Sequence, residues 1–147
     1  MTIERIHTMV VHFPIALLIT SVFLDFLRLA TKRENFERSG FHLLVLGVIG
    51  AVAAVIFGLL AEDAASDRPH IASTIETHET LAFTTALSFI ILLIVRYIFV
   101  RKDNFSKIRP YYLIAAVVGI GLLLTTAYYG GQLVYDYGAA VSAAILK

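Results

Sequence analysis

The sequence has no cysteine, little charge and no sharp metal-binding or haem-attachment signature. Without cysteine the chain forms no disulfide bond, binds no iron–sulfur cluster and offers no thiolate nucleophile. Only 16% of its 147 residues are charged, and a net charge of +1 leaves no concentrated basic surface for nucleic acid. Neither CxxCH nor HExxH occurs, we find no low-complexity segment, and the sequence alone supports no internal repeat. These absences argue against a nucleic-acid-binding protein and leave any metal chemistry to histidines and carboxylates.

Hydrophobic residues make up 59% of the chain, and its mean hydropathy is +0.81, far above that of soluble proteins. Such a composition leaves too little polar surface to cover a globule. We therefore predict a single integral membrane domain over residues 1–147. We expect no cleavable signal peptide, because the first apolar run is too long and no A-x-A site follows it.

Four apolar segments are long enough to cross a bilayer, which takes roughly 20 helical residues. They cover about residues 9–30, 41–61, 78–100 and 110–129. Each must be a helix, because lipid offers no hydrogen-bond partner to an exposed backbone group. The predicted fold class is therefore all-α, a four-helix transmembrane bundle.

The connections between these helices differ in charge. The first and third connections are basic, and the second is acidic. The basic residues in and beside the first and third are Arg28, Lys32, Arg33, Arg38, Arg96, Arg101, Lys102, Lys107 and Arg109. The acidic residues of the second and its borders are Glu62, Asp63, Asp67, Glu76 and Glu79. By the positive-inside rule the basic connections face the cytoplasm. Both termini and the acidic connection then face the outer, periplasmic side of a bacterial inner membrane.

Several positions inside the predicted helices have structural interpretations. Gly50, Ala54 and Gly58 form a small-residue stripe, which predicts close packing of a neighbouring helix, with room for a flat cofactor as the alternative. Asp25 lies near the cytoplasmic end, where we expect it to pair with Arg28 one turn further along.

The last predicted helix is followed by an aromatic and glycine-rich segment. Gly130 and Gly131 predict its end, and Tyr128, Tyr129 and the nearby Tyr135 and Tyr137 suggest an aromatic belt at the membrane surface. Residues 139–146 are too few to cross the membrane, so we expect them along its outer surface.

The predicted topology sorts the five histidines by depth. His7, His12, His70 and His78 fall at the outer end, whereas His42 begins the second helix at the opposite end, where we expect it to contact headgroups. An ionisable residue at the mouth of a membrane helix is by default a functional-site hypothesis.

His12 and His78 are predicted at similar depth on separate helices. Facing imidazoles of a helical bundle can hold a haem iron. They can also hold a zinc or copper ion, with Asp63, Glu76 or Glu79 as further ligands. A third interpretation is a pair of polar side chains that bind water or headgroups at a wet interface.

Two stretches of the sequence resemble a known family. HTMVVHFPIALLITSVFLD near the start and YYGGQLVYDYG near the end, together with His78, resemble the bacterial membrane proteins designated domain of unknown function 2231. The resemblance covers nearly the whole chain and implies a four-helix membrane protein with histidines at the positions of His7, His12 and His78.

The sequence departs from the family pattern in two places. Thr8 stands where a proline commonly follows the first histidine, and Tyr137 stands where a late histidine is expected. If four histidines form two ligand pairs in the family, one pair is incomplete here, which favours a single site.

We therefore predict a small membrane redox protein or subunit that binds one b-type haem near its outer face and transfers electrons. His12 and His78 would be the axial ligands, with His7 as the substitute if His12 forms a hydrogen bond elsewhere. Tyr128, Tyr129 and Gln132 would line the cofactor, and Asp63 would support a ligand through a hydrogen bond.

Two other functions stay open. One is metal-ion binding or transport at an outer histidine and acidic site, and the other is a structural subunit without a site. An accessory or electron-transfer protein fits better than a stand-alone enzyme. The expected partners are the lipid bilayer, respiratory-chain or other membrane subunits, or a periplasmic electron carrier.

Overall fold

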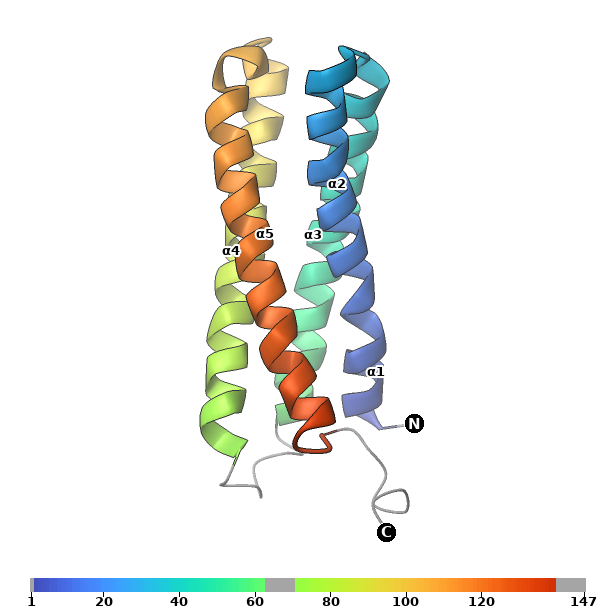
Figure 1. Ribbon diagram of the computed structural model, residues 1–147, viewed down its shortest axis with the longest axis vertical. Helices are drawn as coiled ribbons and strands as arrows, with labels where there is room; N and C mark the ends of the chain where they lie inside the picture. The colour runs from blue at the N-terminus through green and yellow to red at the C-terminus, as the bar shows by residue number, and fades with distance from the viewer. Residues whose placement is uncertain (1, 63–70, 140–147) are drawn as a thin grey trace.

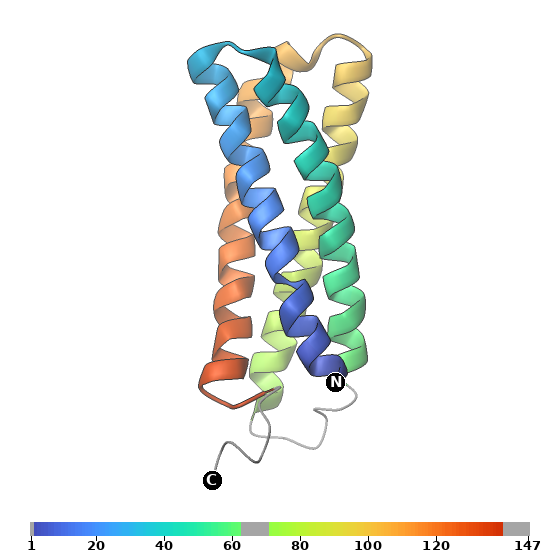
Figure 2. The same ribbon diagram turned by 90° about the vertical axis from the view of Figure 1, so that its right-hand side faces the viewer.

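The computed structural model describes residues 2–62 and 71–139, which form two long helical hairpins side by side (Figures 1 and 2). The helices are α1 (Ile3–Val10), α2 (His12–Thr31), α3 (Glu34–Glu62), α4 (Ala72–Arg101) and α5 (Phe105–Tyr135). Four spans of these helices are long and apolar enough to cross a membrane, with α1 and α2 forming the first, Ile3–Thr31. The predicted all-α four-helix transmembrane bundle is confirmed.

The first span is interrupted at Val11, between α1 and α2. Pro14 explains the interruption, because a proline has no N–H to donate to the carbonyl of Val10, and its ring crowds that carbonyl. The two segments continue in nearly the same direction (Figure 2). The short break therefore leaves His7 and His12 on one membrane span.

The helices extend beyond the predicted apolar segments at both ends. The spans contain 28 to 31 residues, which at 1.5 Å per residue is roughly 42–47 Å. Such a length crosses the headgroup regions as well as the hydrocarbon core. Hydropathy detects only the part in hydrocarbon, because polar residues continue the helix at each surface, as in the Glu34 turn of α3.

The predicted end of the last helix at Gly130 and Gly131 is wrong. Both glycines lie inside α5, which continues to Tyr135. The chain turns only at Gly138, whose φ is 66° and whose N–H donates to the carbonyl of Val134. Gly130 instead makes room for His78, because a Cβ at this position would lie 2.9 Å from Cε1 of that ring.

Glycines also allow the two helices of each hairpin to pack closely. A Cβ at Gly47 would lie 2.6 Å from Cδ2 of Leu18, and a Cβ at Gly119 would lie 3.2 Å from Cζ of Phe89. Leu18 and Phe89 are fully buried, whereas large apolar side chains such as Ile114 are exposed on the outside of the bundle. The predicted packing role of the Gly50–Gly58 stripe is confirmed, since Gly50 lies against Pro14.

The connections between α2 and α3 and between α4 and α5 lie at one end of the bundle, together with the basic residues in and beside them. We call it the basic end. At the opposite end α1 begins and α5 ends (Figure 1). We call this the histidine end, because His7 and His78 lie there.

A buried ion pair joins the two hairpins toward the basic end. Arg96 of α4 donates from both terminal nitrogens to the Asp25 carboxylate of α2, at 2.7 and 2.8 Å, and also to the carbonyl of Glu37 at 2.7 Å. Phe41, Phe105 and Tyr112 surround the guanidinium. The prediction that Asp25 pairs with Arg28 is wrong.

Arg28 instead pairs with the Glu37 carboxylate of α3 at 3.3 Å, and Arg109 of α5 donates to the same carboxylate at 2.6 Å. The physical reason is burial. Arg96 is 0% exposed and Asp25 4% exposed, so neither charge reaches water and each requires the other.

We expect Arg96→Met to lower the free energy of unfolding by about 3–5 kcal/mol, because Asp25 would stay buried without a counter-charge. The double variant Asp25→Leu/Arg96→Met removes both charges and should recover most of that loss. Unfolding in detergent micelles, followed by circular dichroism, measures each value. Arg101→Met, at an exposed position of the same helix, is the control. A double variant no more stable than Arg96→Met would show that the unpaired charge is not the cause.

Candidate histidine site

At the histidine end, the imidazole of His7 on α1 faces that of His78 on α4. Their ring centres are 6.3 Å apart, and the ring planes are nearly perpendicular, at 85°. Both side chains are partly buried between the hairpins. The two membrane spans therefore each bring one imidazole to a common point.

Each of these rings is fixed by a backbone carbonyl of its own hairpin. Nδ1 of His7 lies 3.0 Å from the carbonyl oxygen of Ala54 on α3, and Nδ1 of His78 lies 3.0 Å from that of Thr126 on α5. A carbonyl oxygen only accepts, so Nδ1 is the protonated nitrogen in both rings. In the neutral imidazole the lone pair then lies on Nε2, which has no hydrogen-bond partner among the described residues.

A glycine lies beside each ring, one helical turn after the carbonyl. A Cβ at Gly58 would be 3.1 Å from Cε1 of His7, and a Cβ at Gly130 would be 2.9 Å from Cε1 of His78. Contacts at these distances are tighter than ordinary van der Waals packing. A residue larger than glycine at position 58 or 130 would therefore take up part of the space that the ring fills.

Two threonine hydroxyls support the His78 side of the site. Thr126 and the buried Thr85 lie 2.9 Å apart through their hydroxyl oxygens, and the Thr126 hydroxyl donates to the carbonyl of Leu122. This small network joins α4 to α5 at the residue whose carbonyl holds His78. It restricts the movement of one helix of the hairpin past the other.

His12 lies apart from this pair. Its side chain is exposed, and its Nδ1 lies 2.8 Å from the carbonyl oxygen of Thr8 on the preceding turn. Five residues rotate a helix by about 140°, because each residue turns it by about 100°. His7 and His12 therefore point in different directions, and the ring that faces His78 is that of His7. His42 is exposed beside Phe41, near the basic end.

Tyr128, Tyr129 and Gln132 lie on α5 at the histidine end. The two tyrosine rings pack edge to face at 5.6 Å, and Gln132 donates to the Tyr128 hydroxyl at 3.4 Å. Tyr128 is largely exposed. Their role beside a cofactor stays a prediction.

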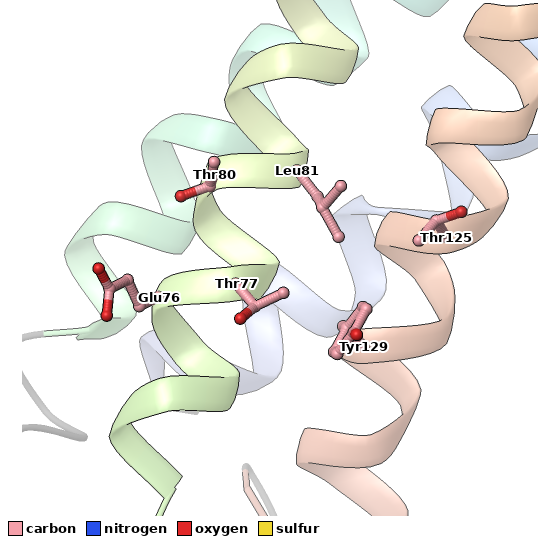
Figure 3. A pocket seen from close by; sticks show the side chains of 6 residues that line it. All are labelled: Glu76, Thr77, Thr80, Leu81, Thr125 and Tyr129. Atoms are coloured by element: carbon pink, nitrogen blue, oxygen red, sulfur yellow. The ribbon is translucent and has the colours of Figure 1, made fainter.

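An open groove of about 430 Å³ lies between α4 and α5 (Figure 3). Its lining is formed by Glu76, Thr77, Thr80, Leu81, Thr125 and Tyr129. Of the tyrosines named above, only Tyr129 lines this groove. Leu81 and Tyr129 project into the space between the two helices.

Asp63 and His70 lie outside the described residues. Within residues 2–62 and 71–139 no three histidine or carboxylate side chains gather closely enough to hold a metal ion. Structural and catalytic zinc sites use three or four protein ligands. Among the described side chains, the site therefore consists of two imidazoles.

The sequence predicts His12 as a ligand from its depth in the membrane, but depth does not show in which direction a side chain points. Direction could be inferred from the glycines, since Gly58 and Gly130 mark where a ring approaches the backbone of α3 and α5. The carbonyls that His7 and His78 contact lie 47 and 48 residues away in the sequence. These contacts are therefore evident only from the folded structure.

Comparison with known proteins identifies the family of this chain. The model of a family described as "Predicted membrane protein (DUF2231)" matches residues 4–143. No curated protein and no solved structure matches the sequence at a significant level. The match includes the His7 and His78 helices, both hairpins and the GGQLVY segment. The chain belongs to the DUF2231 family of predicted membrane proteins.

Proposed function

We propose that this protein is a small membrane electron-transfer protein that binds one b-type haem between His7 and His78. The observation that carries the proposal is the pair of facing imidazoles, each with Nδ1 bonded to a backbone carbonyl and Nε2 without a hydrogen-bond partner among the described residues. A ligating histidine normally donates its other ring N–H to such an acceptor, which fixes the ring and raises its basicity. When bound, haem supplies one-electron redox chemistry.

The separation of the two rings is compatible with one metal held by both. If both Nε2 atoms bound one metal, the ring centres would be roughly 6.4 Å apart, because the metal–nitrogen bond is about 2.0–2.1 Å and a ring nitrogen lies about 1.2 Å from its ring centre. The rings of His7 and His78 are 6.3 Å apart. Their perpendicular planes are compatible, because rotation about a metal–nitrogen bond leaves the separation unchanged.

His7 therefore replaces His12 as the proposed first ligand. The exposed ring of His12 bonds to its own helix, whereas His7 faces His78 directly. Gly58 and Gly130 support this pair of ligands, because the absence of a side chain at each position lets one imidazole lie against α3 or α5.

The charge pattern supports a periplasmic position for this site. The connections at the basic end carry an excess of lysine and arginine, which favours a cytoplasmic location of that end by the positive-inside rule. The histidine end would then face the periplasm of a bacterial inner membrane. Its proposed partners are a periplasmic electron carrier or another membrane subunit of a respiratory chain.

Purified protein in detergent should bind about one haem per chain, with a Soret band that shifts and sharpens on reduction by dithionite. We expect His7→Ala and His78→Ala each to lower haem affinity by at least about tenfold, since each removes one axial ligand. His12→Ala is the matched control, because it removes an imidazole from the same membrane span without removing a proposed ligand. Absorbance titration with haemin measures all three affinities.

Two outcomes would contradict the haem proposal. One is a colourless protein that stays colourless after reconstitution with haemin, in which case elemental analysis for copper and zinc tests the metal-ion alternative. The other is loss of haem in His12→Ala with full retention in His7→Ala. That result would restore His12 as the ligand.

The orientation can be tested by labelling single cysteines, because the chain has none of its own. Ser73→Cys lies at the histidine end and Ser106→Cys at the basic end, and both positions are exposed. An impermeant maleimide added to spheroplasts should label Ser73→Cys and leave Ser106→Cys unlabelled. The reverse pattern would place the histidine site in the cytoplasm.

A further inference from the structure

Contacts between the two hairpins join residues at a nearly constant distance in sequence. Asp25 and Arg96 are 71 positions apart, and Glu37 and Arg109 are 72 positions apart. His7 and His78, which face each other at the opposite end of the bundle, are again separated by 71 positions. Three contacts along the bundle therefore pair a residue of the first hairpin with its counterpart in the second.

Contacts within each hairpin repeat in the same way. Leu18 packs on Gly47 in the first hairpin, and Phe89 packs on Gly119 in the second. The ring of His7 contacts the carbonyl of Ala54 and lies on Gly58. In the same way, the ring of His78 contacts the carbonyl of Thr126 and lies on Gly130. These contacts of the first hairpin thus recur 71 or 72 positions later in the second.

The connections account for the change from 71 to 72. Lys32 and Asp103, which are again 71 positions apart, are the only described non-glycine residues with positive φ, at 59° and 53°. The connection in the second hairpin, residues 102–104, is one residue longer than residues 32–33 in the first. Counterparts before the connection therefore differ by 71 and those after it by 72.

We infer that the two hairpins are repeats of one structural unit, related by a two-fold pseudo-axis along the bundle, and that the histidine pair lies on this axis. On a two-fold axis a residue meets its own counterpart, as His7 meets His78 and Asp25 meets Arg96. Both units begin at the histidine end and run in the same direction (Figure 1). The axis is therefore parallel to the helices and to the membrane normal, as in transporters built of parallel repeats.

The pairs on the axis differ in one important respect. At the histidine end the counterparts are identical, so the site presents two equivalent imidazoles from opposite sides. Toward the basic end the counterparts have opposite charges, Asp25 with Arg96 and Glu37 with Arg109. Two identical units would place like charges together on the axis, which is unfavourable in a buried site. Two units that differ in sequence can instead place opposite charges there.

The identity of the ligand rests on the proposed function. The repeat adds that the two sides of the binding site are related by symmetry. Two equivalent nitrogens, one from each hairpin, would hold the occupant. Gly58 and Gly130 become equivalent positioning residues, because each admits one of the two rings.

The equivalence can be tested with Gly58→Ala and Gly130→Ala in the full chain. Each should lower the affinity for haemin by a similar factor, on the order of tenfold, because each displaces one ligand. Gly121→Ala is the matched control, since a Cβ at Gly121 would meet nothing within 4 Å. A tenfold or larger effect from only one of the two substitutions, in protein with an unchanged melting temperature, would overturn the equivalence.

A measurement without any substitution near the site separates this inference from the haem proposal. In protein labelled with ¹⁵N-histidine and prepared without haem, His7 and His78 should both show a protonated Nδ1 and an unprotonated Nε2. Different tautomers for the two rings would contradict the repeat even if haem binds. Matching tautomers in a protein that binds no haemin would retain the repeat and remove the haem proposal.

Discussion

The buried ion pair between Asp25 and Arg96 sets the register of the whole molecule. Both charges lie where water does not reach, so moving one hairpin along the other by a single turn would separate them at a high energetic cost. Arg96 also binds the carbonyl of Glu37, which joins the start of α3 to the same guanidinium. Because helices are stiff, this register is transmitted to the other end of the bundle. His7 lies 18 residues before Asp25, about 27 Å away along the helix, and meets His78 there.

Close helix packing completes the arrangement that the ion pair begins. Gly47 and Gly119 let α2 and α4 approach the backbones of α3 and α5 near the middle of the membrane. Without a strong hydrophobic force between helices in lipid, such close backbone contacts supply much of the association. At the histidine end Gly58 and Gly130 admit an imidazole in place of a leucine or phenylalanine. Packing of a side chain on a glycine thus forms the core in the middle of the bundle and also shapes the candidate site at the histidine end.

The sequence predicts the membrane fold well, because lipid restricts a chain to a few solutions. Apolar runs predict the four spans, and the small residues of α3 predict the close approach of a neighbouring helix, which is α2 at Gly50. Interactions between distant residues were not predictable in the same way. The partner of Asp25 is 71 residues away, and nothing near it in sequence distinguishes Arg96 from Arg28. The sequence favours His12 over His7 as a ligand because depth can be inferred from hydropathy. The direction of a side chain depends instead on which helix packs beside it.

A solid-state NMR distance in lipid bilayers can show whether His7 and His78 meet at one end of the bundle. The other three histidines, His12, His42 and His70, would be replaced by glutamine so that ring labels report only this pair. With one ring labelled with ¹³C and the other with ¹⁵N by segmental ligation, dipolar recoupling should detect an inter-ring coupling that corresponds to ring centres 6.3 Å apart. No detectable coupling, in protein whose helical content and melting temperature are unchanged, would mean that the two rings do not face each other and would contradict the account.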